Sequence, residues 1–345
     1  MLTSAWRGRS LEEGLLAGRD NFLPLRHFAA FLVLYGHSYH LSAWHPPQMD
    51  WIEALMPRFS AGSFAVYVFF AISGYLVTAS LLRKPGFWRY VRHRFRRLYP
   101  AYLACLLLSV LLLGPLFTTL PLRDYFAGGS QAWQYLLANL NPVTLAWDLP
   151  GVFAHNPVPN TVNGSLWSLG LEVRWYAYLG LLALLGVVAR RWLFTAVALA
   201  FLAFAAWEGL QGKPDPLGYR ALSMVFMAGA LVANWRERVR VSHLGMVAFV
   251  LACVLAHDTR AFFPLAVAAT SYGSYWFAYA LPPLNWPRHI DYSYGLFLYG
   301  FPVQQSLLAL WPGLEPLPFF ALAAPLALVP AALSWHLLEK KIGQR

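Results

Sequence analysis

Charged residues are scarce in this chain. Only 12% of its 345 residues are Asp, Glu, Lys or Arg, whereas 59% are hydrophobic. A soluble domain carries about 25% charged residues, so the composition excludes that class and predicts an integral membrane protein. Cysteine is scarce too. Cys105 and Cys253 lie far apart in apolar runs, so neither a disulfide framework nor a cysteine metal site is expected, and no metal is predicted.

The first 22 residues lack the apolar core of a signal peptide and contain six charged side chains. We therefore expect an uncleaved cytoplasmic leader (1–22), a single transmembrane domain (23–339) and a short tail (340–345). The apolar runs of the domain predict an all-α polytopic fold of about ten transmembrane helices. The expected spans are 24–42, 62–82, 99–120, 164–188, 192–210, 217–234, 241–257, 261–282, 292–311 and 316–338.

Basic residues are distributed unevenly between the segments that join these spans. With the amino terminus inside, cytoplasmic segments hold nineteen Lys and Arg and outer segments hold five. This asymmetry follows the positive-inside rule and places both termini in the cytoplasm. Since topology accounts for the net charge of +11, no nucleic-acid partner is expected, and the basic segments are expected to contact membrane lipids. In the longest outer segment, 121–163, residues 131–140 predict an amphipathic interfacial helix.

Two ionisable residues share one face of the first span. Arg26 and His37 are eleven residues apart, which is about three helical turns and about 16 Å. An arginine at the cytoplasmic end and an imidazole within the membrane suit an elongated ligand with an anionic head and a reactive tail, as in acyl-CoA. Imidazole can also remove a proton from a hydroxyl near neutral pH. The simpler alternative is a buried imidazole that hydrogen-bonds a neighbouring helix.

The segment 83–97 holds seven basic residues after the second span. Within it, Arg94 and Arg97 are three residues apart and share a helical face, and paired guanidinium groups suit phosphate binding. They would bind the same phosphates as Arg26 if the first and third spans were neighbours. A simple topology anchor that contacts anionic lipids is the alternative.

A third polar group, Glu172, lies within the fourth span at about the depth of His37. It is predicted to orient the imidazole or to bind substrate, and the alternative is an ion pair with Arg174. Hydroxyls and aromatic faces of the kind that sugar sites use surround it, although tyrosine and tryptophan also form ordinary membrane-interface belts. The residues concerned are Asn163, Ser165, Trp167, Ser168, Trp175 and Tyr176.

Two other spans contain local breaks in the apolar pattern. The small pair Ser73-Gly74 predicts close packing of the second span against another helix. Pro302 predicts a break in the ninth span. The polar side chains of Gln304 and Gln305 would then need hydrogen-bond partners inside the protein, as in broken helices that line a cavity.

Six motifs, in order, resemble the acyltransferase-3 family of integral-membrane O-acyltransferases, over about residues 20–340. They are the Arg26-x10-His37 spacing, FFAISGYL, the Arg94-x-x-Arg97 pair before LYP, SLWSLGLEVRWYAY, DYSYGLFLYGFPV and LSWHLLEKK.

The resemblance implies ten helices in the bacterial inner membrane and transfer of an acyl group, usually acetyl, from cytoplasmic acyl-CoA. The acceptor would be a hydroxyl of a cell-envelope carbohydrate such as O-antigen or exopolysaccharide. It implies that Arg26, Arg94 and Arg97 bind the donor and that His37 and Glu172 are catalytic, with His37 as base or transient acyl acceptor.

This sequence departs from the family pattern in two ways. Many members have a histidine where this chain has Gly300, so no catalytic role is carried to that position. Many also continue into a periplasmic SGNH-type domain, whereas this chain ends at Arg345. The alternative functions are a transporter or flippase for a lipid-linked sugar or small metabolite, and an O-acyltransferase of another family that modifies a lipid or protein.

Overall fold

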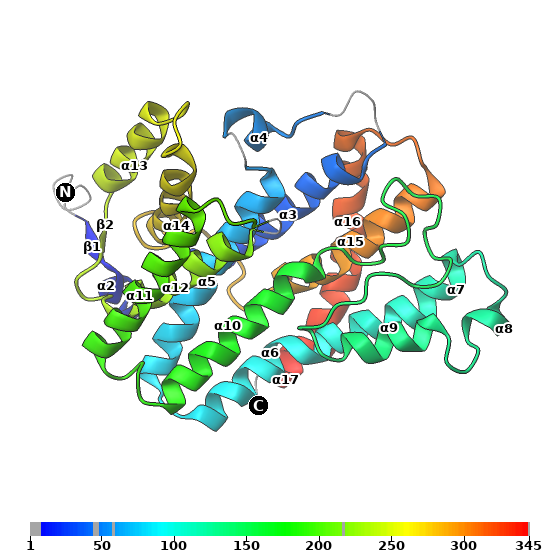
Figure 1. Ribbon diagram of the computed structural model, residues 1–345, viewed down its shortest axis with the longest axis horizontal. Helices are drawn as coiled ribbons and strands as arrows, with labels where there is room; N and C mark the ends of the chain where they lie inside the picture. The colour runs from blue at the N-terminus through cyan, green and yellow to red at the C-terminus, as the bar shows by residue number, and fades with distance from the viewer. Residues whose placement is uncertain (1–7, 44–47, 57–58, 216–217, 344–345) are drawn as a thin grey trace.

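The computed structural model describes residues 8–43, 48–56, 59–215 and 218–343 and is almost entirely helical (Figure 1). The described chain contains one short antiparallel ribbon, in which β1 (Arg9–Ser10) pairs with β2 (Arg240–Val241). This architecture agrees with the all-α fold predicted from composition.

A long helix overlaps each of the ten expected spans. The long helices are α3 (Phe22–Leu41), α5 (Ala61–Arg83), α6 (Phe87–Leu108), α10 (Leu166–Leu184), α11 (Arg191–Leu210), α12 (Tyr219–Asn234), α13 (His243–Leu255), α14 (Phe262–Tyr279), α15 (Ser293–Leu310) and α16 (Pro316–Ser334). A π-helical turn (Ser109–Leu113) joins α6 to α7 (Gly114–Phe117), and another (Trp335–Glu339) joins α16 to α17 (Lys340–Gly343). The shorter helices are α2 (Leu11–Leu16), α4 (Trp51–Leu55), α8 (Leu122–Tyr125) and α9 (Gln131–Asn139).

Four helical stretches of the described residues are long and apolar enough to cross a membrane: α5, α6 through α7, α11, and α16 through α17. Of the most apolar window in α5, 72% is buried inside the protein, but in α11 the share is 17%. A long apolar helix that the protein leaves uncovered is suited to lipid and not to water. The chain therefore has the character of a membrane protein, while the number of crossings and the side on which the termini lie stay predictions.

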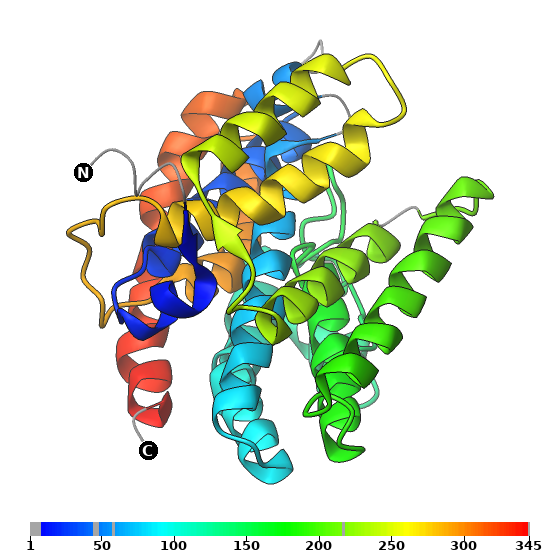
Figure 2. The ribbon, with the colours of Figure 1, turned by 90° about the vertical axis from the view of Figure 1, so that its left-hand side faces the viewer.

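Helix α5 runs through the centre of the bundle, in contact with α3, α12 and α14 (Figures 1 and 2). Its approach to α12 depends on Gly74, where an added Cβ atom would lie 2.2 Å from the carbonyl oxygen of Phe226. No side chain fits there, so the two backbones touch, and the close packing predicted for the Ser73-Gly74 pair is confirmed.

The predicted break at Pro302 is wrong, because α15 continues through the proline. Proline lacks the N–H that would bond the carbonyl four residues earlier, here that of Leu298. Two other groups supply the bond: the Asn163 side-chain amide, at 2.8 Å, and the Cys105 thiol, at 3.4 Å. The helix therefore keeps its course without an unsatisfied carbonyl.

The third long helix begins earlier than expected. It starts at Phe87 instead of residue 99, so most of the basic segment 83–97 is helical and continuous with the apolar part. This continuity fixes Arg94 and Arg97 on the same helix, nearly one turn apart. The expected interfacial segment 131–140 does form a helix, α9.

The expected leader is partly folded onto the helical domain. The side chain of Leu11 is fully buried, and its N–H donates to the carbonyl of Val239 at 3.1 Å. Further along, the side-chain amide of Asn21 donates to the carbonyls of Phe277 and Pro282. The described part of the leader thus packs against the segment after α12 and against the end of α14 and the residues that follow it.

Candidate functional site

A cavity of about 620 Å³ lies between the second turn of α3, the first half of α6, the segment before α15 and the helical segment after α16, and we call it the basic cavity. Arginine guanidinium groups bind phosphates and carboxylates in bidentate fashion, so a concentration of them in one hollow forms an anion site. The charged residues that line it are Arg26, Arg89, Arg92, Arg94, Arg96, Arg97, Asp291, Glu339 and Lys340.

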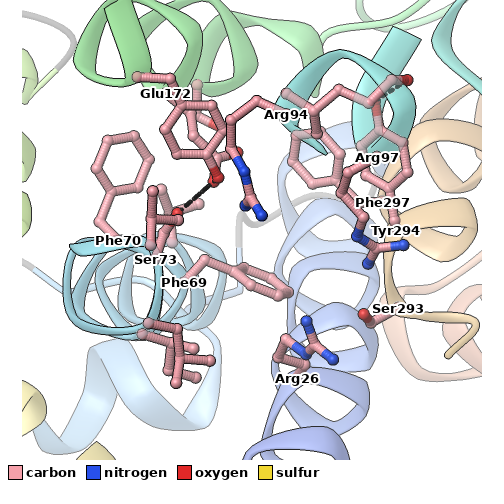
Figure 3. Close-up of a pocket in the computed structure, with 17 residues that line it drawn as sticks. Arg26, Phe69, Phe70, Ser73, Arg94, Arg97, Glu172, Ser293, Tyr294 and Phe297 are labelled. Atoms are coloured by element: carbon pink, nitrogen blue, oxygen red, sulfur yellow. Dashed lines mark hydrogen bonds between the residues drawn. The ribbon is translucent and has the colours of Figure 1, made fainter. Parts of the chain in front are cut away.

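The three arginines singled out from the sequence converge in space. Arg26 reaches the basic cavity from α3, and Arg94 and Arg97 reach it from α6. Figure 3 shows the same three side chains from the adjoining cavity, which they also line. The first and third long helices therefore place their cationic groups around one space. The sequence alone does not show that these two helices are neighbours.

Asp291 binds two of these arginines. Its Oδ2 atom lies 2.9 Å from an Arg26 Nη and 2.8 Å from an Arg97 Nη, and its Oδ1 accepts hydrogen bonds from the N–H and hydroxyl of Ser293. Burial opposes ionisation of this carboxyl, but Arg26 and Arg97 outweigh that cost and hold the pKa of Asp291 well below its ordinary value. The carboxylate is therefore charged at neutral pH.

The three arginines are not equivalent. Arg97 also forms an ion pair with Glu339 at 2.9 Å, so two carboxylates hold its guanidinium. No ion pair reaches Arg94 from the residues that the structure describes; its guanidinium carbon lies 5.6 Å from the centre of the Tyr176 ring. On Arg26, the buried Nε likewise has no hydrogen-bond partner within the described chain. Of the three arginines, Arg94 and one edge of Arg26 are thus left for an anionic ligand.

A second, narrower cavity of about 260 Å³ continues from the three arginines into the bundle, and we call it the middle cavity. Its walls are mostly apolar, but Glu172 and Tyr176 of α10 and Ser73 of α5 form a polar cluster there. The Glu172 Oε1 atom accepts hydrogen bonds from the Ser73 hydroxyl at 2.7 Å and from the Tyr176 hydroxyl at 2.5 Å.

A third cavity, of about 830 Å³, contains His37, and we call it the histidine cavity. The imidazole packs edge-on against the Phe301 ring, with centroids 5.2 Å apart. Its Nδ1 is buried and has no hydrogen-bond partner within the described part of the chain, and the same is true of the Gln304 Oε1. The Gln304 side chain also interacts with the imidazole, and its amide nitrogen donates to the Leu34 carbonyl and the Ser38 hydroxyl, each at 2.9 Å.

The three cavities adjoin one another. The basic and middle cavities share Arg26, Arg94 and Arg97, while the middle and histidine cavities share Val66, Ser168 and Phe297 as a common wall. The path from Arg26 to His37 follows α3 for eleven residues, or about 16 Å.

The structure separates Glu172 from His37, which the sequence placed at similar depths. The two line different cavities, and no hydrogen bond joins them among the described residues. The alternative pairing with Arg174 is absent from the described residues too, because Arg174 donates to the carbonyl of Val143. Depth along a helix fixes the axial position of a side chain but not the direction in which it points.

Several residues of these cavities were not assigned to the site from the sequence. The sequence predicts a packing role for Ser73 and a place at a helix break for Gln304, and it assigns no role to Asp291 or Glu339. A carboxylate beside basic clusters was the available signal for Asp291 and Glu339. Among the described residues no group of three or more His, Cys, Asp or Glu is placed to hold a metal ion.

Comparison with known proteins assigns the chain to a family. Residues 25–336 match the family model described as "Acyltransferase domain". The chain is 28% identical to the O-acetyl transferase of Shigella phage Sf6 over 345 residues, covering 94% of this chain and 96% of that protein. It is 30% identical to Nodulation protein 10 of Rhizobium leguminosarum bv. viciae over 366 residues, covering 93% of this chain and 92% of that protein. No solved structure gave a significant match. Since the family model covers nearly the whole sequence, this chain belongs to the acyltransferase-3 family.

Proposed function

We propose that this protein is a multi-pass O-acyltransferase of the bacterial inner membrane. It transfers an acyl group, usually acetyl, from cytoplasmic acyl-CoA to a hydroxyl of a cell-envelope carbohydrate or lipid-linked glycan. The family and the relative named O-acetyl transferase support the reaction class. The observation that carries the proposal is the row of adjoining cavities, with arginines at one end and a histidine at the other.

The basic cavity would bind the phosphates of the donor. Arg94, without an ion-pair partner in the described chain, and the unpartnered Nε of Arg26 are available to phosphate oxygens. Arg97 would contribute after exchanging one of its carboxylate partners. The volume of about 620 Å³ falls in the range of pockets that bind nucleotide-sized ligands.

His37 would carry the chemistry at the far end of the path. In a direct transfer, its imidazole removes the proton from the acceptor hydroxyl as the oxygen attacks the thioester carbonyl, and that proton passes to the departing thiolate when the C–S bond breaks. In the stepwise alternative, an imidazole nitrogen attacks the thioester carbonyl, the C–S bond breaks and CoA leaves as a thiolate. The acceptor hydroxyl then attacks the acyl carbon, the N–C bond breaks, and the freed imidazole nitrogen takes the hydroxyl proton and passes it to the thiolate. Both routes require the thioester to reach His37.

Gln304 would hold this imidazole in place. The Gln304 Oε1 and the His37 Nδ1 are both buried, and neither has a hydrogen-bond partner among the described residues, although the two side chains interact. A Nδ1–H donated to Oε1 would leave Nε2 as the reactive nitrogen. Gln304 thus suits the orienting role that the sequence suggested for Glu172.

Two observations favour the transporter alternative: a helix broken at Pro302 and charged residues along a route through the bundle. Because α15 is continuous through that proline, the first of these no longer supports it.

The decisive experiment measures CoA release from acetyl-CoA by the purified full chain in nanodiscs, with envelope glycans added. Wild type should release CoA, His37→Ala should lower the rate by about 100-fold or more, and Arg94→Ala/Arg97→Ala should require far more donor. His257→Ala, which changes an exposed histidine that hydrogen-bonds Asp258, is the matched control. Absence of both CoA release and CoA binding in wild type, or full activity in His37→Ala, would refute the proposal.

A further inference from the structure

The polar cluster in the middle cavity lies between the two ends of the proposed reaction path. Glu172, Ser73 and Tyr176 line the same narrow space as Arg26, Arg94 and Arg97, whereas His37 lies beyond the wall made by Val66, Ser168 and Phe297. A ligand that joined the arginines to the histidine would pass this cluster.

One oxygen of Glu172 remains available to such a ligand. Both hydrogen bonds from Ser73 and Tyr176 go to Oε1, and none reaches Oε2 from the residues that the structure describes. The two hydroxyls fix the orientation of the carboxylate, which has no ion-pair partner in the described chain. An ionised carboxylate only accepts hydrogen bonds, so its natural partner is an N–H or O–H group of the ligand.

The shape of the cavity limits which part of a ligand can lie there. Its volume of about 260 Å³ is less than half of the 620 Å³ of the basic cavity, and it falls below the range of about 300–1,000 Å³ typical for whole small molecules. A slender chain fits and a nucleotide does not. Apolar walls, including Phe69, Phe70 and Phe297, would exclude water from such a chain.

We propose that the Ser73–Glu172–Tyr176 cluster is a binding subsite for the amide-bearing pantetheine arm of the donor, with Glu172 accepting an amide N–H. This inference rests on the proposed function. An extended arm of about twelve bonds spans roughly 14 Å at ~1.2 Å per bond, close to the axial separation of about 16 Å between Arg26 and His37. Its two amides lie in the middle of that length and each has an N–H donor, whereas the one hydroxyl of the arm lies nearer to the phosphates.

The test compares two ligands by equilibrium titration of the full chain in nanodiscs: CoA, and 3′-phospho-ADP, which is CoA without the arm. Glu172→Gln keeps the size of the side chain and removes its charge, and a hydrogen bond to a charged group is worth about tenfold or more in affinity. We expect this variant to bind CoA about tenfold more weakly and 3′-phospho-ADP as tightly as wild type. Arg94→Gln should weaken both ligands.

Matched variants keep the test decisive if Glu172→Gln folds poorly. The pair Ser73→Ala and Tyr176→Phe removes the hydroxyls that orient the carboxylate, and each variant should weaken CoA alone. Tyr90→Phe is the control, because it deletes a nearby buried hydroxyl that donates to the backbone carbonyl of Tyr176, and it should change neither affinity.

The outcomes separate this subsite from the proposed function. Unchanged CoA affinity in all three cluster variants, or equal losses for CoA and 3′-phospho-ADP, would overturn the subsite while CoA binding by wild type upheld the function. Wild type that bound neither ligand would overturn both.

Discussion

Substitution of Asp291 tests how the basic cavity balances its charges. In the free protein this carboxylate holds Arg26 and Arg97 at 2.8–2.9 Å, yet an incoming phosphate would have to approach the same guanidinium groups. Asp291→Asn preserves the size of the side chain and removes its charge. The structure therefore predicts that Asp291→Asn lowers the stability of the free protein and tightens its binding of the nucleotide.

The expected magnitudes follow from burial and distance. Breaking a buried ion pair costs about 3–5 kcal/mol; since the two arginines keep 28–29% of their side-chain surface exposed, we expect a loss of about 2 kcal/mol. In the bound state, repulsion between the carboxylate and a phosphate charge at ~6 Å is about 3 kcal/mol at an effective dielectric constant of ~20. Asp291→Asn removes this repulsion, but it also removes the carboxylate that orders the Arg26 and Arg97 side chains, which offsets part of the gain in affinity. We therefore expect about tenfold tighter binding of 3′-phospho-ADP.

The assay is thermal unfolding in nanodiscs with and without 3′-phospho-ADP, joined to direct titration of the nucleotide. Glu237→Gln is the matched control, because it removes one carboxylate from a solvent-exposed pair with Arg191 that is worth about 0–1 kcal/mol. Asp291→Asn with an unchanged melting temperature, or with weaker nucleotide binding than wild type, would refute the reasoning. Weaker binding would mean that Asp291 organises the arginines for the phosphate instead of competing with it.

Three further predictions concern Gln304, Asn163 and the pH dependence of the Asp291 contribution. Gln304→Leu should lower kcat about tenfold or more while leaving the KM for acetyl-CoA within twofold, because Gln304 orients the His37 imidazole and does not bind the donor. A raised KM with unchanged kcat would contradict this. Asn163→Ala should cost about 1–3 kcal/mol in denaturant unfolding, because it deprives the Leu298 carbonyl of its stronger hydrogen bond; a loss below 0.5 kcal/mol would show that the Cys105 thiol suffices. Since the pKa of Asp291 is lowered on folding, the stability that it contributes should be complete above about pH 4, the ordinary range for Asp, and should be lost as the pH falls through the lowered value. Melting temperatures from pH 7 to pH 3 for wild type and Asp291→Asn should therefore differ by a constant amount down to about pH 4, and a difference that vanished by pH 6 would contradict the assignment.

Local helical periodicity was enough to predict the shared faces of the arginines. The spacing of Arg94 and Arg97 depends only on residues per turn, so it holds in any helix, and the structure keeps it although the helix starts twelve residues earlier than expected. The same local argument placed Arg26 and His37 on one face, and the two residues line successive cavities.

Contacts between distant segments could not be read from spacing. Asp291 reaches Arg26 across 265 positions of the sequence, and nothing local indicates that these two segments meet. The error at Pro302 has the same origin, because the carbonyl that proline leaves free is satisfied by Asn163, which lies 135 positions from it. The position of Glu172 depends on the rotation of α10 within the bundle, and that rotation is set by tertiary packing.

The ribbon between β1 and β2 has a consequence for the order in which the chain assembles. Its strands are separated by about 230 residues, so the first strand has no partner until α12 and the segment after it have left the ribosome. At roughly 5–20 residues per second, synthesis of that intervening chain takes about 12–46 seconds. During this interval the N–H of Leu11, a residue that is fully buried in the finished protein, lacks its acceptor, the carbonyl of Val239. Pairing of the amino-terminal segment with the chain after α12 is therefore a late step of biogenesis.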